Sequence, residues 1–193
     1  MKKNSLKMRP TAWLTTLATC LLLTWSSPVQ AGDIKLQAGT GVTTQIMPLF
    51  GLDLIASYKT EGLDLGLIGF DNQETSFTYH NLSGSGNLSD RGLTAAVTVQ
   101  LIAYEFSYFL EKDIGGFSFG PGIGYGFAEM TEDLQVSGGN QLGDPSPFYT
   151  AKDIHYGALL LRGSMSWDLV TCDGIVNSWG GLIGGSLVCG LQF

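Results

Sequence analysis

The stretch GFSFGPGIGYGF, residues 116–127, decides the fold class. Its odd positions hold Phe, Pro, Ile or Tyr, and its even positions hold only Gly or Ser. Successive side chains of a β-strand point to opposite faces, so this segment has one bulky apolar face and one nearly bare face. A helix cannot use a period of two, and each interior glycine would cost a helix about 1 kcal/mol. The stretch therefore predicts a β-strand.

The same alternation recurs along the chain. It is clear in segments 49–59, 62–71 and 154–168, and again from residue 179 to the C-terminus. We predict eight strands, at 34–44, 49–59, 62–71, 74–82, 92–111, 116–129, 152–168 and 178–193. This division puts the Gly-, Asp- and Pro-rich segment 130–151 on the same side as both termini, where barrel turns are usually short. Treating 72–91 as one external loop moves that segment to the other side but leaves seven strands.

The apolar positions change parity within the segment 93–111. They are odd up to Leu101 and even from Ile102 onward, without any Gly, Pro, Asn or Asp between them. A β-bulge would produce this switch, and we favour it over a hidden tight turn or a helix. Turn-forming residues predict loops or turns at 83–87, 112–116, 137–140 and 172–174.

Strands with one apolar face fit either a soluble sandwich of two sheets or a transmembrane barrel. Three features favour the barrel. The polar faces carry small Gly, Ser and Thr residues, as a narrow interior requires. Single charged residues occur in mid-strand on these faces, and aromatic residues cluster near strand ends, as at the two edges of a membrane. We therefore predict an all-β, antiparallel transmembrane β-barrel.

The N-terminus has the three parts of a secretory signal peptide. Four basic residues precede an apolar run over 12–25, and the sequence Val29-Gln30-Ala31 offers small or short residues before a cut at Gly32. An uncleaved anchor helix fits less well because the run is short, and lipidation at Cys20 fits less well because Thr19 precedes it. We predict a signal peptide over 1–31 and one barrel domain over 32–193.

Cleavage would leave an acidic chain with two cysteines. It removes four of the 10 Lys and Arg residues and none of the 17 acids, which changes the net charge from −7 to −11. An acidic, Arg-poor chain is unsuited to nucleic acid, whose binding depends on neutralising phosphates. Cys172 and Cys189 remain, and an even pair in an exported protein is a candidate disulfide, with two reduced thiols as the alternative.

The C-terminus carries the most specific pattern. Leu187, Cys189, Leu191 and the terminal Phe193 occupy alternate positions. In this respect, and in its strand pattern, the chain resembles small bacterial outer-membrane β-barrel proteins, of the eight-stranded class, without matching one particular family. The resemblance implies a Gram-negative outer membrane, contact with outer-membrane lipid, and recognition of Leu187, Leu191 and Phe193 by the barrel-assembly machinery. Cys189 departs from the usual signal but keeps its apolar pattern.

Charged residues on the polar faces predict a network inside the barrel. The expected members are Asp53, Asp64, Glu105, Arg162 and Asp168. Arg162 is the obvious cation, and it should pair with one or more of these acids because a buried unpaired charge is costly. An eight-stranded interior is about wide enough for side chains to fill, so a wide pore is not expected.

Candidate catalytic residues are few. His80 and His155 are weak candidates, since neither lies in a recognised barrel-enzyme motif, and we predict no metal site and no cofactor. The sequence therefore favours a structural or surface-interaction role carried by loops, whose ligand it does not identify. The alternatives are a barrel enzyme that modifies outer-membrane lipid, with one of these histidines as base, and a soluble periplasmic β-sandwich or lipid carrier.

Overall fold

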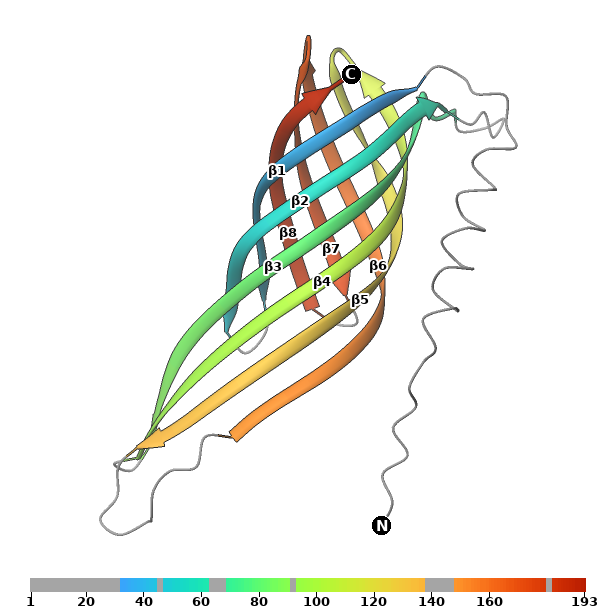
Figure 1. Cartoon of the computed structure of the whole chain (residues 1–193). Coiled ribbons are helices and arrows are strands. Elements are labelled where there is room, and N and C mark those ends of the chain that lie inside the picture. Colours follow the sequence, from blue (N-terminus) through green and yellow to red (C-terminus); the bar gives the residue numbers. More distant parts are fainter. Residues whose placement is uncertain (1–31, 45–46, 63–68, 91–92, 138–147, 180–181) are drawn as a thin grey trace, which may run out of the picture. The chain divides into compact units, whose positions relative to one another are not determined.

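The computed structural model describes residues 32–44, 47–62, 69–90, 93–137, 148–179 and 182–193. These residues form one closed antiparallel barrel in which each strand pairs with its neighbours in sequence and β8 pairs with β1 (Figure 1). The strands are β1 (Asp33–Thr44), β2 (Pro48–Glu61), β3 (Asn72–Asp90), β4 (Leu93–Ile114), β5 (Phe117–Ser137), β6 (Phe148–Trp167), β7 (Val170–Trp179) and β8 (Leu182–Gln192). No helix in these residues is long and apolar enough to cross a membrane. The prediction of an eight-stranded β-barrel is confirmed, and the β-sandwich alternative is wrong because the sheet closes on itself.

The register of the strands makes them tilt around the barrel. A row of directly paired residues that starts at Ile34 crosses all eight strands and returns to β1 at Thr44, a stagger of ten residues. Such a stagger goes with strands inclined by roughly 35–45° to the barrel axis. The ring closes at the C-terminus, where the Phe193 amide donates to the Ile34 carbonyl at 2.9 Å and the Ile34 amide donates to the Phe193 carbonyl at 3.0 Å.

The two ends of the barrel differ. The terminal end holds Asp33, Phe193, the connection between β2 and β3, and the tight turns after β4 and β6; the far end holds the other four connections. Strands β3–β6 run beyond the others at the far end (Figure 1). The pairing of β2 with β3 stops at Ser83, and that of β7 with β6 stops at Ala158. Residues 84–90 and 148–157 are therefore the two edges of a four-stranded extension.

Several predicted strand limits were wrong. The predicted loop 83–87 belongs to β3, and the predicted turn 172–174 belongs to β7, because small turn-forming residues also suit strands that enclose a crowded interior. The ring of eight closes without a strand at 62–71, of which 63–68 lie outside the described residues. β5 ends and β6 begins at the far end, so the connection between them does not lie on the side of the termini. Within 112–116 the turn is confined to Gly115 and Gly116, whose φ angles of 61° and 86° favour glycine.

The parity switch in β4 is not a bulge. The pairing of β4 with β3 runs without interruption from Leu93 to Glu111, and odd residues face inward throughout. Outward residues are apolar from Ile102 to Leu110 and mostly polar from Thr94 to Gln100, whereas the inward Val99 and Leu101 are buried and apolar. The surroundings of the strand change along its length, and its backbone register stays the same.

The bare face of β5 makes room for side chains from neighbouring strands. A Cβ atom at Gly122 would lie 2.5 Å from the Phe109 ring, and one at Gly126 would lie 2.2 Å from the Tyr156 ring. A Cβ atom at Gly124 would lie 3.1 Å from the Glu105 carboxylate. The alternating glycines that indicated a strand thus decide where the large interior residues fit.

Candidate functional site

The outer wall of the barrel is apolar on all eight strands. Leu36 on β1, Leu54 on β2, Ile123 on β5 and Leu159 on β6 have exposed fractions of 54%, 43%, 63% and 72%. Soluble proteins rarely expose contiguous apolar patches larger than a few hundred Å². We call this surface the apolar band; it comprises Ile34, Leu36, Val42, Phe50, Leu52, Leu54, Tyr58, Phe77, Tyr104, Phe106, Phe117, Phe119, Ile123, Tyr125, Leu159, Leu161, Met165, Trp167, Val170, Val176, Ile183, Leu187 and Leu191.

A row of rings closes the apolar band towards the extension. Tyr79, Tyr104, Phe127 and His155 are direct neighbours on β3–β6. The ring centroids of Tyr79 and Tyr104 are 5.4 Å apart, and those of Phe127 and His155 are 5.2 Å apart. Beyond this row the outward residues are mostly polar, including Asn81, Ser83, Thr98, Gln100, Glu129, Thr131 and Asp153. Rings at the boundary of an apolar band are typical of membrane barrels, where they lie at the level of the lipid headgroups.

The interior near the terminal end holds a charge cluster centred on Arg162. The Arg162 Nε donates to Glu111 Oε1 and its Nη1 donates to Glu74 Oε1, both at 2.7 Å. The guanidinium lies over the Phe109 ring, 4.1 Å from its centroid. Asp173 Oδ2 is 3.7 Å from Nη1. All four charged side chains are buried, so each charge depends on its partners for compensation.

Two lysines balance the acids of this cluster. Lys35 Nζ lies 2.9 Å from Glu74 Oε2 and is fully buried, and Lys59 Nζ lies 3.5 Å from Glu111 Oε2 with 14% of its side chain exposed. The cluster of Lys35, Lys59, Arg162, Glu74, Glu111 and Asp173 is therefore formally neutral. Each charged side chain lies beside a side chain of opposite charge, which offsets the cost of burying the cluster. Removal of one member would leave an uncompensated charge in the interior.

A second polar cluster lies further along the barrel. His80 Nδ1 is 2.7 Å from Asp53 Oδ1, and the Ser186 hydroxyl donates to the other oxygen of Asp53. The Ser107 hydroxyl donates to Glu105 at 2.6 Å. Towards the far end, the interior is filled by apolar side chains, among them Leu49, Leu82, Val99, Leu101 and Met130. The interior thus changes from charged to polar to apolar along the barrel.

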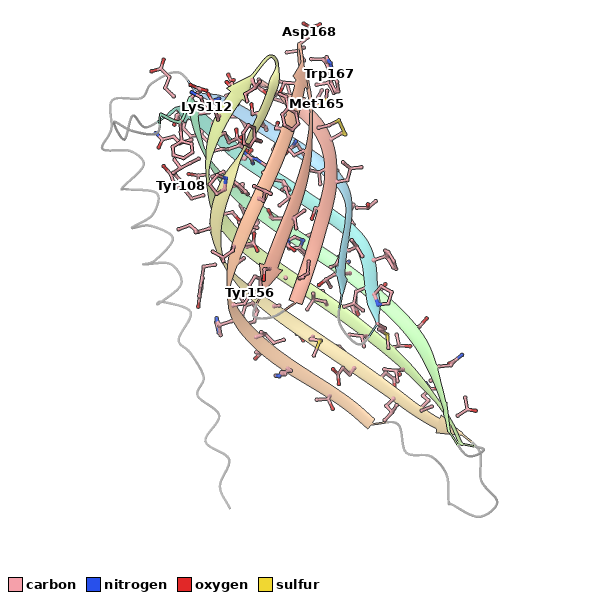
Figure 2. All side chains as sticks on the ribbon, turned by 180° about the vertical axis from the view of Figure 1, so that it is seen from behind. Tyr108, Lys112, Tyr156, Met165, Trp167 and Asp168 are labelled. Carbon is pink, nitrogen blue, oxygen red and sulfur yellow. A yellow bond between two sulfur atoms is a disulfide. The ribbon has the colours of Figure 1, made fainter. Side chains whose placement is uncertain are left out.

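The predicted interior network is placed only in part. Asp53, Glu105 and Arg162 are buried inside the barrel, whereas Asp64 lies outside the described residues. Asp168 is wrong as a member: it lies exposed at the tip of the turn after β6, with a φ of 50° (Figure 2). The acids that pair with Arg162 are Glu74, Glu111 and Asp173, and none of them was predicted. The two-residue alternation of β4 could have identified Glu111, because it places Glu111 on the same face of the strand as Glu105.

In the described part of the chain, the contacts of the two histidines differ from those of an activated nucleophile. His80 is buried and lies beside Asp53, and the Ser186 hydroxyl donates to that acid. His155 is on the outer wall, where the Tyr125 hydroxyl lies 3.2 Å from its Nδ1. In a Ser-His-acid triad the base contacts the nucleophile and the acid orients the base. The observed contacts do not have that order.

The predicted C-terminal residues and cysteines share the outer wall. Leu187, Leu191 and Phe193 have exposed fractions of 65%, 48% and 64%. Cys172 on β7 and Cys189 on β8 are direct neighbours and form a disulfide. The alternative, two reduced thiols, is therefore wrong.

The fold defines a class, the closed antiparallel β-barrels of eight strands. Over 85% of this chain and 100% of the other, the structure is similar to the attachment invasion locus protein Ail of Yersinia pestis in complex with the heparin analogue sucrose octasulfate, with a TM-score of 0.52 and 11% sequence identity. This likeness shows the fold. The match to Neisserial surface protein A covers 83% of this chain and 95% of that protein's chain, with a TM-score of 0.42 and 12% sequence identity. The N-terminal β-barrel domain of Pseudomonas aeruginosa OprF covers 84% and 100% (TM-score 0.43, 12% identity). Those two scores are too low to support an argument. No protein-family profile and no curated protein sequence matches the chain.

Proposed function

We propose that this chain is an integral outer-membrane β-barrel protein with a structural or surface-interaction role at its far end. The observation that carries the proposal is the two-part outer wall, which is apolar up to the row of rings and polar on the extension beyond it. A closed barrel satisfies its backbone hydrogen bonds internally, which is the condition for crossing lipid without helices. The fold shared with an outer-membrane protein supports the same location.

The direction of insertion follows from the ends of the barrel. Bacterial barrels keep short turns and both termini on the periplasmic side and longer loops outside. Here the terminal end would face the periplasm, and the extension formed by β3–β6 would face outward. Export would use the signal peptide over 1–31, and N-terminal sequencing of the mature protein should then begin at Gly32.

The first test separates membranes and compares unheated with boiled samples on a gel. We expect the protein in the outer-membrane fraction, resistant to extraction by alkaline carbonate, with a mobility that shifts on boiling because the closed barrel survives SDS until heated. Deletion of Phe193 serves as a comparison, since it removes the proposed assembly signal and two ring-closing hydrogen bonds. A soluble periplasmic protein without a mobility shift would overturn the proposal.

The far end suits a neutral or cationic partner. Segments 81–100 and 128–157 contain six acids, Asp90, Glu129, Glu132, Asp133, Asp144 and Asp153, against the two basic residues Arg91 and Lys152. Complementary charge favours association, and like charge opposes it. Ail was crystallised with the heparin analogue sucrose octasulfate, which is a polyanion. For this chain we expect no retention on immobilised heparin at physiological salt and salt-sensitive binding of an oligolysine probe; the reverse result would contradict the charge argument.

No observation favours the enzyme alternative. The contacts of His80 and His155 suit packing and hydrogen bonding. His80→Ala and His155→Ala should leave the mass spectrum of lipid A in whole cells identical to that of wild-type cells. A change that also appears on deletion of the gene would revive the enzyme alternative.

A further inference from the structure

The disulfide lies on the outside of the barrel, within the apolar band. Cys172 and Cys189 are directly paired, with their Cα atoms 4.0 Å apart, and both occupy outward positions. Cys172 is paired on its other side with Met165, and Cys189 with Ala38. Leu187 and Leu191 flank Cys189 on the same face of β8. The residues that surround the two sulfur atoms on the outer wall are thus apolar.

Cys189 also lies inside the edge of the apolar band. Cys189 is four residues from the C-terminus, which at about 3.4 Å per residue and a tilt near 40° places it about 10 Å from the end of the barrel along its axis. Phe193 and Trp167, both largely exposed, lie between it and that end. Cys189 borders a shallow groove of about 560 Å³ on the outer wall, lined mainly by apolar residues of β1, β2, β3 and β8. In a membrane this groove would be filled by lipid tails.

Thiol–disulfide chemistry cannot proceed in that surrounding. Formation and reduction of a disulfide both require attack by a thiolate, which is a charged species. A charge in hydrocarbon is costly, and a water-soluble oxidase or reductant does not reach about 10 Å into the band. The bond must therefore form before the barrel enters the membrane.

We propose that Cys172 and Cys189 are oxidised in the unassembled, exported chain by a periplasmic thiol–disulfide oxidoreductase, and that the bond pre-forms the β7–β8 hairpin for assembly. This rests on the proposed location in the outer membrane. Two thiols lose two protons and two electrons and become one disulfide, while the disulfide of the oxidoreductase is reduced to a dithiol. After insertion the surrounding lipid protects the bond from reductants.

The hairpin that the bond closes is the one that completes the barrel. β8 pairs with β1 to close the ring, carries Leu187 and Leu191, and is followed directly by Phe193. A cross-link that closes a loop of about 17 residues favours the closed arrangement in an otherwise unfolded chain on the order of a hundredfold. The register between β7 and β8 would then be fixed before β8 meets the assembly machinery or β1.

The first experiment tests protection in native membranes that contain the wild-type protein. The membranes are treated with a membrane-impermeant phosphine reductant, and the freed thiols are then labelled with a polymer-linked maleimide that retards the chain on a gel. We expect no label in intact membranes and two labels after boiling in SDS. Equal labelling before and after boiling would overturn the placement of the disulfide in lipid, even for a protein shown to reside in the outer membrane.

The second experiment tests the order of events by pulse labelling. Acid quenching and alkylation report the thiols, and gel mobility without heating reports the folded barrel. We expect the unassembled mature chain to be oxidised already, and a C172A/C189A variant to assemble several-fold more slowly than a Val176→Ala control on the same outer face. Folded barrel that first appears with free thiols, or equal assembly rates, would refute the inference. Failure of the proposed function itself would be distinct, because the wild-type protein would then be absent from the outer membrane.

Discussion

Replacement of Arg162 by Met is the most direct test of the interior charge cluster. The side chain is 1% exposed and contacts Glu74, Glu111 and Asp173, so its loss leaves a formal charge of −1 buried in the barrel. Breaking a buried ion pair by removing one partner costs about 3–5 kcal/mol. The free energy of unfolding of a domain of this size changes by about 2 kcal/mol per M urea. We therefore expect the midpoint of urea unfolding to fall by roughly 1.5–2.5 M.

The assay is urea unfolding of the barrel in lipid vesicles, followed by tryptophan fluorescence and by gel mobility without heating. The matched control is the double variant Arg162→Met/Glu111→Gln, which removes one charge of each sign and restores a neutral cluster. Because replacing both partners of a buried ion pair often leaves the stability unchanged, the double variant should recover most of the decrease in the urea midpoint. If Arg162→Met unfolds within about 0.5 M of the wild-type protein, or if the double variant is no better than the single one, the charge cluster does not act as described.

Three further predictions concern other parts of the barrel. Gly126→Ala should destabilise it by about 1–3 kcal/mol, because the new Cβ would lie 2.2 Å from the Tyr156 ring, whereas Gly157→Ala, where nothing lies within 4 Å, should be neutral in the same urea assay. On β4, Phe106→Arg should lower the free energy of unfolding by about 2–4 kcal/mol, because it puts a charge in the apolar band. Thr98→Arg, on the same face of β4 within the extension, should leave that free energy almost unchanged. Equal effects of the two substitutions would show that the membrane boundary does not lie at Tyr104. Before β3, the pKa of Asp71 is lowered, first by the hydrogen bond from the Asp113 amide and then by Lys112. Its ionised form therefore stabilises this connection above the ordinary carboxyl pKa, and the contribution is lost as pH falls through the depressed value. In an NMR titration Lys112→Ala should raise that pKa only partway, and full restoration would contradict the order of causes.

Some features of the fold could be read directly from period two. The alternation in β2, β5 and β6 predicted these strands and the faces that point outward, because a strand in a barrel wall has only two possible surroundings for its side chains. The predictions failed where a local signal had two meanings. The segment Ser83–Asn87 has the composition of a loop, yet it forms part of β3 because small residues also suit a strand at the edge of the extension.

The prediction of a β-bulge at the parity switch in β4 was wrong for a related reason. A sequence shows where apolar residues change faces, but the change can come from the backbone or from the surroundings. On β4 the register is continuous, and towards the far end the outward residues change from apolar to mostly polar while the inward residues change from polar to apolar. The neighbouring polar residues of β3, β5 and β6 identify this level, and their alignment with β4 is a property of the tertiary structure.

By itself, the sequence determined the fold class, the outward faces of β2, β5, β6 and β8, the acidic character of the chain and the two cysteines as a candidate pair. Each depends on composition or on spacing within one segment. Only the tertiary structure decided which acids meet Arg162, because Glu74, Glu111 and Asp173 come from three different strands. It also decided that Asp168 turns away from the interior and that Cys172 faces Cys189 on the outer wall. These contacts depend on the register and stagger of the closed ring, which are set by the packing of all eight strands together.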